Sequence, residues 1–200
     1  MSDAHAWRVR AIIIALLTAF VLLVTSCSVE RQSDNAVHVT GIGRAATPGE
    51  IHAWDVDVNP TGSNLPPGSG TYAAGATVFA QKCAACHGAH GEGSGPYPRL
   101  IGRDPRTGFP FGENPAYVKT VGNYWPYATT VFDYVRRAMP LTQPGSLHDD
   151  EVYGVVDYLL AENGIVGRDA AMDATTLPRV QMPARGKFVR DDRTGGRTFR

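Results

Sequence analysis

The 200-residue chain has few cysteines and no excess of charge of either sign. Its three cysteines, at positions 27, 83 and 86, are too few for the disulfide framework of a small secreted scaffold. Basic and acidic residues number 19 each, so the chain has no net charge to attract nucleic acid, and we predict no nucleic-acid partner. By contrast, 22 glycines and 14 prolines indicate that much of the chain is turn and loop around one small core.

The chain also lacks an apolar run long enough for a permanent membrane span near its N-terminus. Arg8 and Arg10 precede residues 11–24, which carry no charge. A transmembrane helix needs about 20 apolar residues, so residues 1–26 are more typical of a signal peptide. Small residues precede Cys27, a pattern that resembles the lipid-accepting cysteine of bacterial lipoproteins. We predict a lipoprotein-type signal peptide and a periplasmic protein held at a membrane surface by lipid at Cys27; the alternatives are an ordinary signal peptide or an uncleaved anchor.

Beyond the signal peptide, composition divides the chain into three parts. Residues 27–70 are polar and rich in Gly and Pro, which predicts a tether and N-terminal extension with a short extended segment at 51–60. Residues 71–164 carry the helical apolar periodicities and form the predicted domain. Residues 165–200 are Arg-rich and broken by Pro and Gly, which predicts an extended basic tail.

Four helices are predicted in the central part, so the expected fold class is all-α. Apolar residues at helical spacing predict the first helix from Tyr72 to about Cys83. Caps and breakers predict the other three, which run from Asn114-Pro115 to near Gly122, from Ala128 to Ala138, and from Ser146 to Gly164.

The sequence Cys83-Ala84-Ala85-Cys86-His87 matches the attachment motif of c-type haem. Two thiols separated by two residues can add to the two haem vinyl groups, and the histidine that follows can bind the iron. A zinc site would need a second ligand pair, and a thioredoxin-like dithiol would need a βαβ frame. The sequence offers neither, so we predict one covalent haem c, attached through Cys83 and Cys86, with His87 as an iron ligand.

The second axial ligand of the iron has to come from elsewhere in the chain. Cytochromes c commonly place Met opposite His, and Met139 stands at the end of a predicted helix and before Pro140. A thioether held on this stiffened segment can reach into a haem crevice, so we predict Met139. The other candidates are Met172 and Met182, which are expected to pack loosely on the surface, and His90 and His148.

Three further residues are predicted to contact the haem or its histidine. A ligating histidine normally donates its other N–H to a carbonyl, and Pro98 is the expected acceptor. Leu100 is expected to pack on the haem face. Trp125 lies in an aromatic cluster before the Met139 helix, and its N–H is expected to bond a haem propionate, with plain core packing as the alternative.

These features together resemble the monohaem class I cytochromes c. The shared layout is a leading helix, CAACHG, the PRLIG sequence of residues 98–102, a middle helix, Met139-Pro140 and a closing helix. Longer stretches are similar to the cytochrome subunit of the Sox sulfane dehydrogenase; they are residues 52–70, 121–140, 147–165 and 177–188. The resemblance implies a class I cytochrome c fold over residues 71–164 and a molybdenum-cofactor dehydrogenase subunit as partner. Some members of that family carry two haems, whereas this chain has a single attachment motif.

The resulting prediction is an electron carrier. It would pass single electrons from the molybdenum dehydrogenase to a downstream cytochrome or oxidase, as the electron-transfer subunit of a complex rather than as a catalyst in its own right. The alternatives are a haem catalyst or gas sensor with an open axial position, and the cytochrome subunit of a different periplasmic dehydrogenase. Residues 51–70 and 165–190 lie outside the minimal haem domain and are the predicted docking surfaces.

Overall fold

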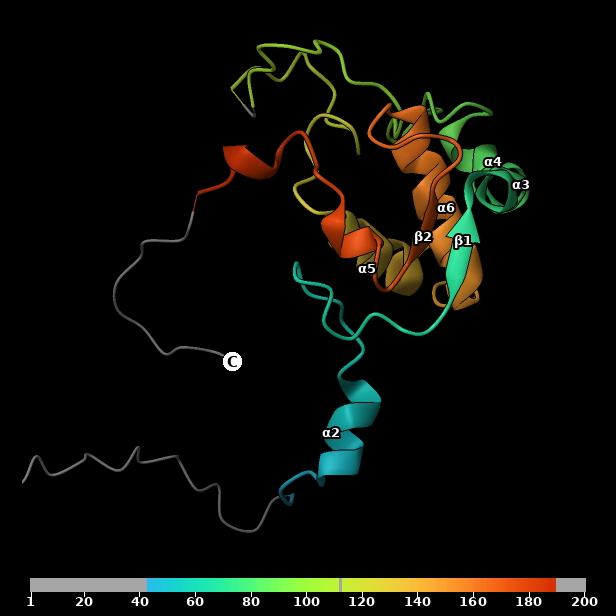
Figure 1. The fold of residues 1–200 in the computed structure, drawn as a ribbon, viewed down its shortest axis with the longest axis vertical. Coiled ribbons are helices and arrows are strands. Elements are labelled where there is room, and N and C mark those ends of the chain that lie inside the picture. Colours follow the sequence, from blue (N-terminus) through green and yellow to red (C-terminus); the bar gives the residue numbers. More distant parts are fainter. Residues whose placement is uncertain (1–42, 112, 190–200) are drawn as a thin grey trace, which may run out of the picture. The chain divides into compact units, whose positions relative to one another are not determined.

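The computed structural model describes residues 43–111 and 113–189, and the described residues from Thr47 onward form one compact unit. The predicted signal peptide and Cys27 lie outside the described residues. The helices are α2 (Pro48–Trp54), α3 (Tyr72–Lys82), α4 (Ala84–His87), α5 (Ala128–Ala138) and α6 (Asp149–Glu162) (Figure 1). The strands β1 (Ser69–Thr71) and β2 (Ala171–Asp173) pair antiparallel, and two 3-10 helices span Leu177–Arg179 and Arg185–Lys187. These two short strands form the only sheet among the described residues, and the other regular elements are helices. The predicted all-α class is therefore confirmed.

Helices α3 and α6 cross at two glycines. A Cβ added to Gly75 would lie 1.8 Å from the carbonyl oxygen of Gly154, so the two backbones can approach this closely only because Gly75 has no side chain. Beside the crossing, the rings of Phe79 and Tyr158 pack with their centroids 4.9 Å apart. The crossing therefore holds α3, and the cysteine-bearing segment that follows it, against the core.

Helix α5 packs on the other side of the core with Val131, Phe132 and Val135, all of which are buried. The ring of Phe132 lies 4.5 Å, centroid to centroid, from that of Tyr153 in α6. Full burial of a large apolar side chain stabilises a fold by about 1.5–3 kcal/mol. The predicted helix at 128–138 is confirmed, and its C-cap residue is Met139.

The first and last predicted helices also form, with small differences at their ends. Helix α3 ends at Lys82, one residue before the predicted end. Helix α6 begins at Asp149 because His148, not Ser146, is its N-cap, and the His148 backbone N–H donates to Glu151 Oε2 at 2.9 Å. A side chain three residues beyond the cap satisfies a backbone N–H that the helix leaves free.

The helix predicted over residues 115–122 is wrong, because the chain there forms turns. Asn114 Oδ1 accepts from the Ala116 N–H at 2.9 Å, but no helix follows, because Asn123 takes over the backbone groups that a helix would use. Its Oδ1 accepts from the Thr120 N–H at 2.8 Å, and its Nδ2 donates to the Val118 carbonyl at 2.9 Å. Asparagine side chains compete with helical hydrogen bonds in this way, and the buried Asn123 stabilises the turn instead.

The extended segment predicted at 51–60 is also partly wrong, because its first four residues belong to α2. The Thr47 side chain accepts from the Glu50 N–H at 3.3 Å, and Glu50 Oε2 accepts from the Thr47 N–H at 2.8 Å. This reciprocal capping box, with Pro48 in the first turn, starts a helix where the alternating apolar pattern favoured a strand.

The C-terminal segment is buried more deeply than the sequence predicted. Strand β2 pairs with β1, and Met172 at its centre is 3% exposed. Leu177 and Met182 further on are 0% and 4% exposed, so the prediction that Met172 and Met182 pack loosely on the surface is wrong. The sequence of this segment shows no long repeat of apolar residues, because only single residues, separated by turns, reach the core.

Asp157 is a carboxylic acid inside the core. It is 0% exposed on α6, and neither carboxylate oxygen has a hydrogen-bond partner in the part of the chain that the structure describes. Burial raises the pKa of Asp157 to about 6, and the nearby backbone amide of Tyr72 lowers it by less.

We expect Asp157→Asn to make the protein more stable above pH 6. Because the folded-state pKa lies above the unfolded one, Asp157 favours folding most below pH 4, and this contribution is lost as pH rises to about 6. A difference of about two pKa units between the folded and unfolded states corresponds to about 3 kcal/mol in the free energy of unfolding. Denaturant unfolding of the haem-loaded protein between pH 4 and 8 measures the effect, with exposed Asp169→Asn as control. An equal pH dependence of wild type and Asp157→Asn would contradict it.

Candidate functional site

The motif cysteines lie on one short helical turn. Cys83 is the C-cap residue of α3, and α4 begins directly after it. The backbone N–H groups of Cys86 and His87 donate to the Cys83 carbonyl at 3.1 and 3.0 Å. Residues three apart on a helix share a face, so Cys83 and Cys86 lie on the same side of the turn. Both are free thiols and half-buried. Gly88, with φ of 82°, ends the turn in a conformation that glycine favours.

The ring of His87 is held by the loop that follows. Its Nδ1 lies 2.9 Å from the Pro98 carbonyl oxygen, which is the contact predicted from the sequence. A carbonyl can only accept, so Nδ1 carries the proton and donates, and Nε2 keeps a lone pair for a metal. The Gly93 N–H donates to the His87 carbonyl at 2.7 Å, so the same loop fixes both the backbone and the ring of the histidine.

Several apolar side chains that pack against the core are only half-buried. Leu100, Ile101, Trp125 and Met139 all pack against the core but remain partly exposed. Two thiols with an adjacent imidazole are the donor set that c-type haem uses, and half-buried apolar side chains are suited to cover the faces of such a flat apolar group. The residues present therefore fit a covalent haem.

The Cys83 thiol has the wrong acidity for a reactive redox cysteine. Burial raises the pKa of the Cys83 thiol to about 11, although neighbouring Lys82 lowers it by less. Reactive cysteine pairs have depressed pKa values because the thiolate is the nucleophile. Within the ranges 43–111 and 113–189, no three side chains of His, Cys, Asp or Glu gather as a metal site. These observations favour a haem attachment turn over a dithiol or a zinc site.

Comparison with known proteins agrees with this geometry. The cytochrome c family model matches residues 72–162, from the start of α3 to the end of α6. A chain in the crystal structure of the sulfane dehydrogenase SoxCD from Paracoccus pantotrophus is 42% identical, with a TM-score of 0.66, over 76% of this chain and 72% of that one. The chain belongs to the cytochrome c family. No curated protein matches it.

As a c-type cytochrome, the protein binds one covalent haem c and transfers electrons. Cytochrome c domains typically work in the periplasm or outside the cell. The described helices include none with the length and apolar character of a membrane span.

The candidates for the second axial ligand of this cytochrome differ in exposure. Met172 and Met182 are buried in the core at 3% and 4% exposure, while His90 and His148 are exposed. Met139 is half-buried and packs against the core. Its backbone N–H donates to the Val135 carbonyl at 3.1 Å, which anchors it at the end of α5.

Trp125 has a different hydrogen-bond partner from the one predicted. Its Nε1 donates to Thr130 Oγ1 at 2.8 Å, and this hydroxyl donates to the Tyr127 carbonyl at 2.9 Å. The indole N–H is thus satisfied within the chain, and a bond to a haem propionate stays a prediction. The Tyr134 ring of α5 lies 5.7 Å, centroid to centroid, from that of Trp125.

Sequence reasoning missed Asn163, the residue that ties the Pro98–Gly102 loop to α6. Its Oδ1 accepts from the Gly102 N–H at 2.9 Å, and its Nδ2 donates to the carbonyls of Leu100 at 3.3 Å and Leu159 at 2.8 Å. The only sequence signal was its place beside the terminal Gly164, which indicates a helix end and says nothing about the loop.

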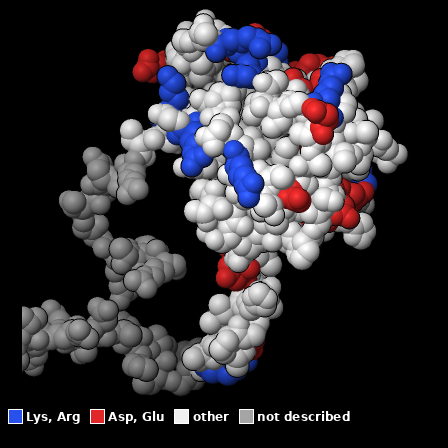
Figure 2. Space-filling view, in the orientation of Figure 1, with Lys and Arg blue, Asp and Glu red and all other residues white. Residues whose placement is uncertain are grey.

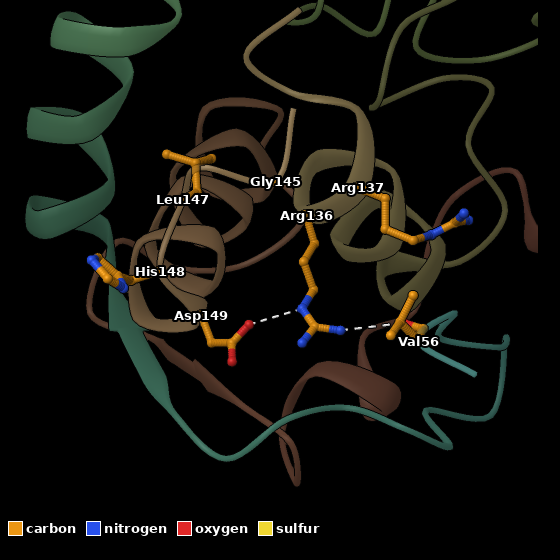
Figure 3. Close-up of a pocket in the computed structure, with 7 residues that line it drawn as sticks. All are labelled: Val56, Arg136, Arg137, Gly145, Leu147, His148 and Asp149. Atoms are coloured by element: carbon orange, nitrogen blue, oxygen red, sulfur yellow. Dashed lines mark hydrogen bonds and ion pairs between the residues drawn. The ribbon is translucent and has the colours of Figure 1, made fainter. Parts of the chain in front are cut away.

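A separate pocket between α5 and α6 does not contain these residues (Figure 3). Arg136 on its wall bonds Asp149 at 2.9 Å and the Val56 carbonyl at 3.2 Å. Arg137 bonds Asp133, and His148 lines the pocket as well. Because both guanidinium groups already have acidic partners, the pocket offers no free charge to a ligand.

Proposed function

We propose that Cys83 and Cys86 attach the haem and that His87 and Met139 bind its iron. The hydrogen bond from His87 Nδ1 to the Pro98 carbonyl carries this proposal, because it orients the ring and leaves Nε2 free. Bound haem would supply a one-electron couple between ferric and ferrous iron. The half-buried apolar side chains would exclude water, and the Met139 thioether would raise the reduction potential.

We further propose that the cytochrome accepts electrons from a molybdenum-cofactor dehydrogenase subunit and passes them to a downstream cytochrome or oxidase. The similarity to a chain of a sulfane dehydrogenase supports this partner. The experiment is purification of a C-terminally tagged protein from native membranes in mild detergent. We expect molybdenum and a second polypeptide to elute with the haem in equal amounts. Elution of the cytochrome without molybdenum would contradict the partnership.

The membrane attachment proposed for Cys27 has its own test. We expect Cys27→Ser to move the cytochrome from the membrane to the soluble periplasmic fraction, since the lipid would have no acceptor thiol. Fractionation followed by haem staining measures this, with the neighbouring Ser28→Ala as control. A variant that stays in the membrane would indicate an uncleaved anchor, and a soluble wild type would indicate an ordinary signal peptide.

A further inference from the structure

Residues 94–98, which end in the carbonyl that accepts from His87, are exposed. Burial therefore contributes little to fixing the Pro98 carbonyl oxygen 2.9 Å from His87 Nδ1. On one side of this stretch the Gly93 N–H donates to the His87 carbonyl at 2.7 Å. The position of the Pro98 carbonyl then depends on how firmly the other side, residues 99–102, is attached to the rest of the fold.

Asn163 supplies an attachment on that other side. It is 3% exposed at the C-terminal end of α6, and its Oδ1 accepts from the Gly102 N–H at 2.9 Å. Its Nδ2 donates to the Leu100 carbonyl at 3.3 Å and, within α6, to the Leu159 carbonyl at 2.8 Å. A flipped amide would turn its oxygen toward these two carbonyls, so the arrangement has one orientation and ties the loop to the helix.

The turn before α5 binds the same loop. The hydroxyl of buried Thr120 donates to the Gly102 carbonyl, and the Val121 N–H donates to the Leu100 carbonyl at 3.2 Å. Both the N–H and the carbonyl of Gly102 are therefore bonded to buried side chains. Because a buried polar group left without a partner is costly, this network favours one position of the loop backbone.

We propose that Asn163 is a positioning residue that sets the reduction potential of the haem through His87. The inference rests on the proposed binding of iron by His87. By fixing the loop, the Asn163 amide keeps the Pro98 carbonyl within bonding distance of Nδ1. A carbonyl that accepts this proton makes the imidazole a stronger electron donor, which favours ferric iron and lowers the potential. Loss of the Asn163 bonds would loosen the carbonyl and raise the potential.

The test is redox titration of the haem-loaded protein with neutral substitutions. Figure 2 shows basic and acidic side chains on the same face of the molecule, and because charges near a haem also shift its potential, no substitution changes charge. Asn163→Leu, which removes the three side-chain bonds, is expected to shift the ferric–ferrous equilibrium about tenfold toward ferrous. For one electron this equals a rise of about 59 mV. Thr120→Val, which removes the hydroxyl that bonds Gly102, should raise the potential by less.

Thr129→Val is the matched control. Thr129 is also buried, but its hydroxyl donates to the Pro60 carbonyl at 3.2 Å, outside the Pro98–Gly102 loop. This variant should lose stability and keep the wild-type potential.

The second measurement is exchange of the His87 ring proton with solvent, followed by NMR in the ferrous state. We expect this proton to exchange about tenfold faster or more in Asn163→Leu, and at the wild-type rate in Thr129→Val, because the Pro98 carbonyl protects it. A role in stability alone would lower the melting temperature without moving either the potential or this exchange.

A folded Asn163→Leu protein with the wild-type potential and ring-proton exchange would overturn the positioning role. If this variant does not fold, Thr120→Val decides by the same two measurements, and unchanged values there overturn the proposal. His87 ring signals that lack the shift caused by a bound haem in the ferrous wild type would instead contradict the proposed iron ligand. The two failures are therefore distinguishable.

Discussion

Replacing Cys83 and Cys86 together with alanine is expected to abolish covalent haem attachment. The two thiols share one face of a short turn, and no other described cysteine can replace them. Without the haem, Leu100, Ile101 and Trp125 would remain half-exposed to water, so the fold should lose stability as well. The measurement is a pyridine haemochrome spectrum after acid-acetone extraction, which removes haem that is not covalently bound.

Ala85→Ser is the matched control for this experiment. Ala85 lies between the cysteines but is exposed, so a hydroxyl there should leave attachment intact. Haem that survives extraction in the double cysteine variant would contradict the attachment site. His87→Ala should also prevent stable incorporation, because it removes both the iron ligand and the bond to the Pro98 carbonyl.

The second large effect is expected from Met139→Ala, which should leave the haem attached and open the iron. Axial ligands set haem potentials over a range of about 0.8 V, and loss of the thioether should lower the reduction potential by on the order of 0.1–0.3 V. The reduced variant should bind carbon monoxide readily, and the weak far-red band of a methionine–iron bond should disappear. Redox titration and absorption spectra measure these changes.

Met172→Leu and Met182→Leu are the controls for Met139. Both residues are buried in the core, and leucine nearly conserves their volume, so each variant should keep the wild-type potential at a modest cost in stability. A potential that follows one of these methionines instead of Met139 would overturn the ligand assignment. Carbon monoxide binding by the reduced wild type would favour the alternative of a catalyst or gas sensor with an open iron site.

The helices whose apolar residues recur at helical spacing were predicted well. The stripe from Tyr72 to Phe79 packs against Tyr158 of α6. The helix predicted from breakers at residues 128–138 also has the bounds of α5. The failures occurred where side chains bond the backbone. Asn123 replaces a helical ladder with a turn, and the Thr47–Glu50 capping box starts a helix at a segment whose alternation favoured a strand.

The turn proposed to bind the haem could be located in the sequence because its chemistry is local. Cys83, Cys86 and His87 are near neighbours in the chain, so their spacing alone places two thiols and an imidazole on one turn. The Pro98 carbonyl lies only eleven residues further, and general knowledge of histidine ligands was enough to select it. For the second axial ligand of the iron, the sequence offered several candidates, among which we preferred Met139.

Contacts between distant segments could not be read in the same way. The approach of Gly75 to Gly154, the bond from Asn163 to Gly102, and the burial of Met172 each join residues that local patterns treat as unrelated. The contacts of Phe188 with Tyr124 and of Arg185 with Tyr127 likewise join segments that are distant in the sequence. Close packing depends on which surfaces meet, so the covalent chemistry of this cytochrome follows from its residue order, whereas the surroundings of its haem site follow from the folded chain.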